Sequence, residues 1–231
     1  MGNNNNIFFV SKEKLILKAN AMLNIANDMG IKDAIVEVSE NNGFSVGVRK
    51  SNVETIEKTR EKSASITVFK NHSKGYAQTS NFSDDAIRDT VLKAVDIAKY
   101  TAKDSYSGLP NKNDLEFSPR YLPLFFQWNL SPEEAINIAL EAENAAFNVS
   151  PQIKNSDGAS LSSSHGHFYM ANTQGFSGGY PHSRHGLSVA PIAQFENQME
   201  RDFWYTTDRD PMKLSNPFDV GDYAARKALS R

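Results

Sequence analysis

The chain has 231 residues, of which 25 are Lys or Arg, 27 are Asp or Glu and none is Cys, and its formal net charge at pH 7 is −2. At roughly 150 residues per domain, this length predicts one large domain or two small ones. The lack of cysteine excludes disulfides, cysteine-ligated zinc, iron–sulfur clusters and a thiolate nucleophile. The near-neutral, interspersed charge gives no general field that would attract nucleic acid or an anionic membrane surface.

Targeting signals are absent from the sequence pattern. The first ten residues hold four asparagines and a short apolar run, too short for the apolar region of a signal peptide. No stretch approaches the ~20 apolar residues of a membrane span. We therefore expect a cytoplasmic protein that has neither nucleic acid nor a membrane as a partner.

The first hundred residues predict a helix, a set of strands and a second helix. Apolar residues recur at helical spacing between Ser11, a suitable N-cap, and Gly30, a typical C-terminal stop. From residue 33 to 80 the apolar period changes to two, which predicts an antiparallel meander of short strands at 34–38, 44–48, 53–59, 64–69 and 75–79. Turn signals stand at Asn41-Asn-Gly43 and Asn71-His-Ser73, and Ser83 caps the second helix.

The second half repeats this order of elements. Residues 103–129 lack periodicity and contain three prolines, which indicates a long connection. Ser131-Pro132-Glu133-Glu134 is a capping box with proline at the first helical position. Strands are then expected at 159–164, 166–172, 186–195 and 199–207, followed by a helix that begins at Asn216-Pro217 and ends at Arg231.

These patterns predict an α+β fold of two units, each with antiparallel strands packed against amphipathic helices. The expected boundaries are an N-terminal α+β domain at 1–103, a connection at 104–129 and a second α+β domain at 130–231. The two units share an order of elements without a residue-level repeat.

One glycine-rich segment has the spacing of a catalytic motif. Gly175-Phe-Ser-Gly-Gly179 fits the G-x-S-x-G nucleophile elbow of serine hydrolases. An elbow needs a sharp strand-to-helix turn, whereas two glycines and Pro181 follow Ser177 and oppose a helix. The histidines that follow, His182 and His185, have no acid between them and the serine, although the elbow enzymes place one there. The residues therefore argue against a serine nucleophile.

The five histidines provide no standard zinc motif. None precedes a glutamate, so an H-E-x-x-H helix is excluded. His165 and His167 would point to one face of a strand, where a metal could bridge them. A zinc site needs a third protein ligand, which His182, His185 or Asp208 would have to supply through folding. The pattern favours two half-exposed strand histidines over a metal site.

Two other groupings contain residue types that could support chemistry. Glu141 and Glu143 would face apart on a helix, so they cannot act as a carboxylate pair. Phe203, Trp204 and Tyr205 could form a base-stacking strip, but they alternate in direction and acidic residues interleave them. We expect these aromatic residues to pack in the core beside a solvated edge.

Several segments together resemble a known family. They are Asn155 to Ser164, Ala171 to Pro181, Ser183-Arg-His185, and Met199 to Thr207 with Arg209-Asp210, preceded in the same order by Val46 to Arg49, Gly75 to Ser80 and Ser107 to Leu109. These segments resemble the PmbA branch, also called TldE, of the TldD/PmbA family, and the resemblance covers essentially the whole chain. His165-Gly-His167 departs from the family pattern, in which basic residues flank the glycine.

The resemblance implies a function. TldD and PmbA are related subunits of a cytoplasmic bacterial heterodimeric metalloprotease that removes leader peptides and degrades unfolded antitoxin. The zinc-binding helix belongs to TldD, so the resemblance implies a non-catalytic partner subunit with no catalytic or metal-binding residue, and zinc in a TldD-like partner. Family members are roughly twice this length, so the resemblance also implies that this is a fragment without the C-terminal domain.

The same glycine-rich segment is the candidate substrate-binding site. Strands that end there could present backbone N–H and C=O groups to an extended peptide, as in strand addition. The candidates are Gly175, Phe176, Ser177, Gly178, Gly179, Tyr180 and His185. The glycines would either permit close backbone approach or supply positive φ in a tight turn, and both interpretations stay open. The alternative function is a free-standing peptide-binding or assembly module, or a nonfunctional remnant, without protease activity.

Overall fold

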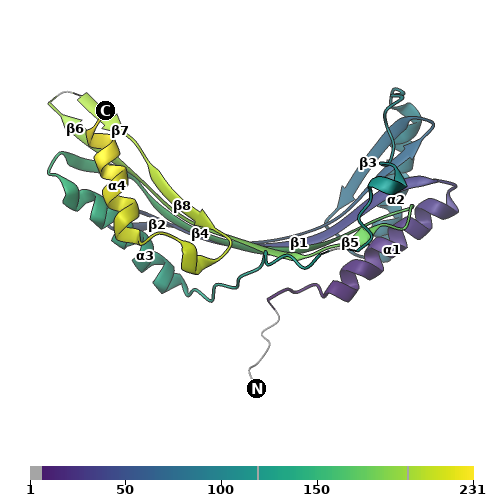
Figure 1. Cartoon of the computed structure of the whole chain (residues 1–231), viewed down its shortest axis with the longest axis horizontal. Coiled ribbons are helices and arrows are strands. Elements are labelled where there is room, and N and C mark those ends of the chain that lie inside the picture. Colours follow the sequence, from purple (N-terminus) through teal and green to yellow (C-terminus); the bar gives the residue numbers. More distant parts are fainter. Residues whose placement is uncertain (1–6, 119, 197) are drawn as a thin grey trace, which may run out of the picture. The chain divides into compact units, whose positions relative to one another are not determined.

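The computed structural model describes residues 7–118, 120–196 and 198–231, and Figure 1 shows their course. The residues before position 7, for which the sequence predicts no targeting segment, lie outside this description. The helices are α1 (Lys12–Asp28), α2 (Asp84–Tyr100), α3 (Pro132–Val149) and α4 (Pro217–Leu229), with short 3₁₀ turns η1 (Lys112–Asp114) and η2 (Pro211–Lys213). The strands are β1 (Asp33–Arg49), β2 (Asn52–Lys70), β3 (Ser73–Thr79), β4 (Ile153–Asn172), β5 (Ser177–Gly178), β6 (Pro181–Phe195), β7 (Gln198–Arg201) and β8 (Trp204–Asp208).

Hydrogen bonds join the strands in the order β3-β2-β1-β4-β6-β7, with β5 on β4 and β8 on β6. The β2–β3, β4–β5, β6–β7 and β6–β8 pairs are antiparallel. Helices packed on antiparallel strands confirm the predicted α+β class.

The contacts group into two compact units. Unit 1 comprises the described residues up to Asn41, Arg60–Leu122 and Gly166–Pro181, and unit 2 comprises Asn42–Thr59, Pro123–His165 and His182–Arg231. Strands β1, β2 and β4 contribute residues to both units because each is long. The division predicted from the sequence, into domains at 1–103 and 130–231 joined by a connection at 104–129, stays a prediction.

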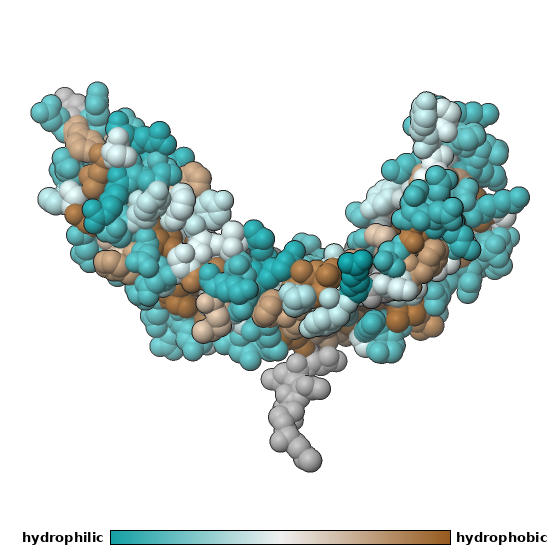
Figure 2. Space-filling model, in the orientation of Figure 1, coloured by the Kyte–Doolittle hydropathy of each residue, from teal (hydrophilic) through white to brown (hydrophobic). Residues whose placement is uncertain are grey.

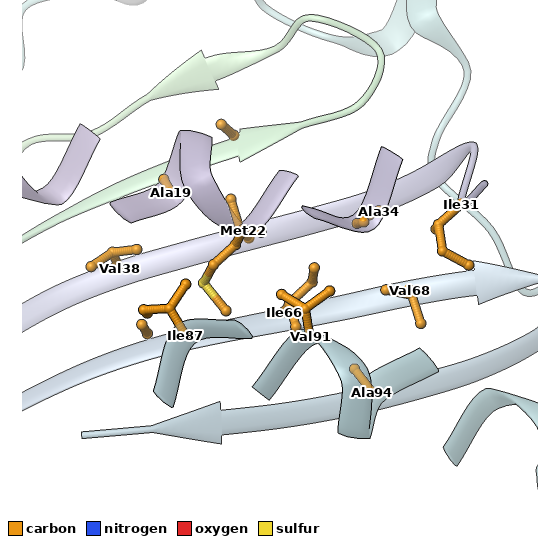
Figure 3. Close-up of a cluster of buried hydrophobic side chains, with 14 of the residues drawn as sticks. Ala19, Met22, Ile31, Ala34, Val38, Ile66, Val68, Ile87, Val91 and Ala94 are labelled. Atoms are coloured by element: carbon orange, nitrogen blue, oxygen red, sulfur yellow. The ribbon is translucent and has the colours of Figure 1, made fainter. Parts of the chain in front are cut away.

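The core of unit 1 lies between two helices and the strands β1 and β2. Figure 3 shows side chains of α1 and α2 meeting apolar side chains of the strands; Ala19, Met22, Ile31, Ala34, Val38, Ile66, Val68, Ile87, Val91 and Ala94 are labelled. On β1, buried residues alternate with half-buried ones from Asp33 to Glu40. This alternation places every second side chain on the helix-covered face, as the period of two predicts.

Helix ends in unit 1 follow the predicted capping residues. The Ser11 hydroxyl accepts the Lys14 N–H at the start of α1, and the Ser83 hydroxyl accepts the Ala86 N–H at the start of α2. Gly30 has φ +74°, a left-handed conformation that suits glycine just after a helix. The local sequence therefore sets where these two helices begin and where α1 ends.

The core of unit 2 packs α3 and α4 closely against each other and against the strands. Small residues make this approach possible: Ala139, Ala142 and Ala146 on α3 and Ala224 on α4 are buried. A side chain on Gly221 of α4 would collide with the Ala142 carbonyl oxygen. The α3 cap matches its sequence signature, because the Ser131 and Glu134 side chains each accept the other residue's backbone N–H.

Some predicted strand boundaries are wrong. The structure has a single strand, β1, where a turn was predicted at Asn41-Asn-Gly43, and the chain reverses instead at Lys50 and Ser51, with φ of 50° and 61°. Gly43 is a strand residue whose missing side chain leaves room for the Thr59 hydroxyl on β2. The second predicted turn is confirmed at Asn71 and His72, which also have positive φ.

The second half differs from the prediction in the same way. β4 is one strand from 153 to 172 rather than two, and β6 begins at residue 181 rather than 186. The single strand predicted at 199–207 is instead two strands, β7 and β8, and α4 ends at Leu229 rather than Arg231. Continuous pairing with neighbouring strands overrides the weak local breaks at glycine and asparagine.

The surface drawn in Figure 2 is largely hydrophilic, with hydrophobic residues scattered between polar ones. No described helix has both the length and the apolar character needed to cross a bilayer.

Candidate functional site

The predicted binding segment forms a short hairpin at the end of β4 in unit 1. β4 ends at Asn172, and the chain turns and returns as β5, in which Ser177 pairs with Ala171 and Gly178 pairs with Met170. The structure thus brings six of the seven candidate residues, 175–180, together on one hairpin and the residues that follow it.

Asn172 organises this turn. Its buried side-chain oxygen accepts the N–H groups of Gln174 and Phe176, each at 3.0 Å. Its backbone N–H donates to the Phe176 carbonyl, and its carbonyl accepts the Gly175 N–H. Sequence reasoning missed this role, although an asparagine before a glycine-containing turn is a known signal for such side-chain-to-backbone bonds.

Thr173 anchors the turn to the start of β1. Its N–H donates to the Ala34 carbonyl at 3.0 Å, and its hydroxyl accepts the Ala34 N–H at 3.0 Å. Together with the Asn172 bonds, this contact uses the backbone donors of residues 173–176 inside the protein. These four N–H groups are therefore not presented to a ligand in this conformation.

The structure explains differently why glycine stands at each of the three positions 175, 178 and 179. Gly175 has φ +93° and open space where a Cβ would stand, so it supplies the left-handed conformation of the turn. A Cβ on Gly179 would collide with the Phe168 carbonyl of β4, so this glycine permits close approach within the chain itself. Gly178 shows neither feature, since its nearest contact would be the Phe176 ring at 3.8 Å.

Two aromatic side chains flank the hairpin. Tyr180 is 41 % exposed and its ring meets the Phe168 ring edge-on, with centroids 4.7 Å apart. Phe176 is half-buried. The segment therefore presents an exposed serine and an exposed tyrosine next to a short strand.

Ser177 has no catalytic surroundings among the described residues. Its side chain is exposed on β5, and neither a histidine nor a carboxylate is hydrogen-bonded to it there. No helix follows it, so the nucleophile elbow is absent from this part of the chain.

The seventh candidate, His185, lies in unit 2 and is buried, with 1 % exposure. Its Nε2 is 3.0 Å from the Phe126 carbonyl, and its Nδ1 is 2.9 Å from the Ser163 hydroxyl. Because a carbonyl only accepts, Nε2 carries the proton and Nδ1 accepts from the serine. Both ring nitrogens are thus used inside the protein, Nε2 by Phe126 of the 124–128 segment and Nδ1 by Ser163 of β4. The binding role of His185 stays a prediction.

The residues weighed for metal binding do not fit a zinc ion. His167 is 8 % exposed and its Nε2 lies 3.5 Å from the Glu40 carboxylate, while the Phe8 ring stacks on it at 4.0 Å. Within the described residues no group of three or more His, Asp or Glu side chains could hold a metal ion. The zinc chemistry that the sequence resemblance implies therefore has no matching donor set in residues 7–118, 120–196 and 198–231.

The buried Glu40 is a feature that sequence reasoning missed. Its two carboxylate oxygens accept the N–H groups of Phe9, at 3.1 Å, and Val10, at 2.8 Å. Burial lowers the pKa of His167, and the nearby Glu40 charge only partly opposes that effect. Glu40 thus fixes the segment that leads into α1, and His167 is favoured in its neutral form.

The prediction that the aromatic residues 203–205 pack in the core is wrong. Phe203 is 54 % exposed, Trp204 is 38 % exposed and Tyr205 is 53 % exposed. The Phe203 and Tyr205 rings stack with centroids 6.3 Å apart, while Trp204 packs on Tyr223 of α4. They lie on or just before β8, whose only partner among the described strands is β6, so neighbouring strands do not bury them.

These features define a class: a two-unit α+β protein of antiparallel strands and capped helices, with strand-edge segments exposed and no zinc donor set in its described part. Two models of one family match this chain, the PmbA/TldA metallopeptidase domain 1 over residues 34–98 and the central domain over residues 127–231. The chain belongs to this family, the TldD/PmbA family whose pattern the sequence resembles.

Curated relatives carry the PmbA name. The chain is 39 % identical over 198 residues to Metalloprotease PmbA of Escherichia coli O157:H7. The alignment covers 86 % of this chain and 44 % of that protein. It is 32 % identical over 228 residues to a Metalloprotease PmbA homolog of Buchnera aphidicola. That alignment covers 99 % of this chain and 50 % of the relative. The chain thus spans about half the length of these relatives.

Solved structures share the fold. A proposed modulator of DNA gyrase from Bacteroides thetaiotaomicron aligns with a TM-score of 0.86 at 17 % identity, over 95 % of this chain and 50 % of that one. TldE from Thermococcus kodakarensis aligns with a TM-score of 0.75 at 14 % identity, over 90 % of this chain and 47 % of that one. At these identities the likeness concerns the fold alone.

Proposed function

We propose that this chain acts as the non-catalytic, PmbA-type subunit of a cytoplasmic peptidase complex. In the proposal a TldD-like partner carries the zinc and performs peptide hydrolysis, and this chain contributes surface for the partner and for an extended polypeptide substrate. Leader peptides and unfolded antitoxin are the substrates that the family resemblance suggests.

One observation carries the non-catalytic assignment. The chain belongs to a metallopeptidase family, yet its described residues hold no set of side chains that could bind a metal ion. His185 already uses both ring nitrogens internally, and His167 is enclosed by Phe8 and Glu40. A zinc-dependent hydrolysis therefore needs ligands from outside these residues.

The proposed substrate contact uses the strand β5. Within the described strands β5 pairs only with β4, so its second edge has no partner strand there. An extended peptide could add to this edge through main-chain hydrogen bonds, which need little sequence specificity. The exposed Tyr180 next to it offers a ring on which an apolar side chain could rest.

The assembly test is co-purification of this chain with the TldD-like chain of the same organism. We expect a stable complex of defined stoichiometry by size-exclusion chromatography with light scattering. Metal analysis should find zinc in the complex and in the isolated partner, and none above background in the isolated chain. Stoichiometric zinc in the isolated chain, or no complex at micromolar concentrations, contradicts the proposal and favours a free-standing binding module.

The substrate contact is tested separately within that complex. Tyr180→Ala and a proline at position 177, Ser177→Pro, should raise the KM for an unstructured peptide, because the first removes the ring and the second removes a strand donor. Tyr106→Ala, which removes a 97 % exposed tyrosine on the connection, is the matched control. Equal KM values for all three variants and the unmodified complex would place the substrate elsewhere.

A further inference from the structure

Unit 2 contains an apolar pocket that the proposed function does not use. It has a volume of about 370 Å³ and lies between α3, the strands β4 and β6, and the segment that leads from η2 into α4. Leu161, Leu187 and Ile138 form part of its wall, and Trp128 lines it as well. This volume and this largely apolar lining are typical of pockets that bind small organic molecules.

The polar groups of the pocket are few, and two of them are already occupied. The Ser215 N–H donates to the Thr206 hydroxyl, and the Asn216 side chain accepts the Phe218 N–H as the cap of α4. Glu141 is the only ionisable residue among those that line the pocket. Its side chain is exposed on α3 and makes no hydrogen bond or ion pair with any described residue.

This combination favours one kind of ligand. A carboxylate attracts a cation, and the face of a tryptophan ring attracts an ammonium group through its quadrupole. An anion would be repelled by Glu141, and a fully apolar molecule would gain nothing from that carboxylate. The apolar wall then accepts the hydrocarbon part of the ligand.

Met212 gives the pocket a flexible side chain that can adjust to the shape of a ligand. It lines the same pocket and is 88 % exposed, so its side chain is free to move over an occupant. Methionine is flexible and polarizable, and it commonly fills irregular gaps around ligands.

We propose that this pocket binds a small organic ammonium, with its hydrocarbon part against Leu161 and Leu187 and its charged end beside Trp128 and Glu141. This site lies in unit 2 and involves none of the residues of the β5 segment. Amine binding is measured on the chain alone, so its result is read separately from the assembly test.

The test uses tryptophan fluorescence. The chain has two tryptophans, so Trp204→Phe leaves Trp128 as the only reporter. The full chain with this change is titrated with n-hexylammonium, n-hexanol and n-hexanoate, which share one hydrocarbon chain and differ in charge. We expect n-hexylammonium to bind about tenfold more tightly than n-hexanol, from the usual strength of an ammonium–aromatic contact and an exposed ion pair, and n-hexanoate to bind most weakly.

Glu141→Gln isolates the charge. It should weaken n-hexylammonium binding about two- to fivefold and leave n-hexanol binding unchanged. Glu133→Gln, an exposed glutamate of the same helix that does not line the pocket, is the matched control and should change neither. Equal affinities for the three probes, or equal effects of the two variants, would overturn the proposal.

A second measurement locates the binding without any tryptophan change. Methyl NMR of the unmodified chain labelled at methionine should show the Met212 signal shifting in step with n-hexylammonium. Saturation of the fluorescence signal with no change at Met212 would place the amine outside this pocket.

Discussion

Glu143 connects α3 to the β1–β2 turn, and its removal is the most informative perturbation of the fold. The side chain is fully buried, and its two oxygens accept the Lys50 N–H at 3.0 Å and the Ser51 N–H at 2.9 Å. Lys50 and Ser51 both have positive φ although neither is glycine. The carboxylate thus holds a turn whose own residues do not favour its conformation.

The magnitude follows from two opposing effects. Two hydrogen bonds to a charged acceptor are worth about 3–6 kcal/mol together. Burying a carboxylate costs several kcal/mol, and that cost disappears when the side chain is removed. If the second effect offsets about half of the first, Glu143→Ala should lower the free energy of unfolding by about 2–3 kcal/mol. Glu143→Gln keeps one acceptor and turns an NH₂ group toward the other N–H, so it should cost nearly as much.

The assay is urea denaturation followed by tryptophan fluorescence. Both tryptophans, Trp128 and Trp204, belong to unit 2, so the signal reports the unit that contains Glu143 and the turn. Glu141→Ala is the matched control, because that glutamate is exposed on the same helix, and its effect should stay within about 0.5 kcal/mol. If Glu143→Ala and Glu141→Ala have the same midpoint, the carboxylate does not stabilise the turn and the reasoning is refuted.

Three further predictions concern unit 1. Because the pKa of His167 is lowered by burial, its contribution to stability is complete above the ordinary value of 6.5 and is lost as the pH falls below it. Urea midpoints followed by far-UV circular dichroism should therefore drop below about pH 6.5, and the His167 part of that drop should vanish in His167→Gln. Gly75→Ala should cost about 2 kcal/mol or more in thermal unfolding, since the new Cβ would collide with a carbonyl of α2, whereas Gly108→Ala meets no atom and should be neutral. Asn172→Ala should speed proteolysis within residues 173–178, and Asn172→Asp, which keeps the acceptor, should resist it; equal cleavage rates would contradict the role of this side chain.

The sequence singled out the glycine-rich segment as a candidate site, which stays a prediction, and it did not show how the turn of that segment is built. The sequence left two interpretations of its glycines open, close backbone approach or positive φ in a tight turn, and the structure gives Gly175 positive φ. The side chain that organises the turn, Asn172, and its anchor on Ala34 were not predicted, since the partner residue of that anchor is 139 positions away. His185 was predicted from its position in a family motif, whereas its burial depends on Phe126, on a segment without periodicity.

The sequence by itself determined the class of fold, the helices and their caps. Ser11, Ser83, Ser131 and Asn216 each bind an N–H within three residues, so the code for these helix starts is local and readable. Alternation of apolar residues likewise set which face of β1 is buried. Family membership also followed from the residues.

Only the tertiary structure decided where the first strand ends. A local turn signal at Asn41-Asn-Gly43 was overridden by continuous strand pairing, and the chain turned at Lys50 and Ser51, which carry no such signal. The carboxylate that stabilises that turn comes from Glu143, more than ninety residues away. Packing brought the two together, and no local pattern could encode a hydrogen bond between segments so distant in the chain.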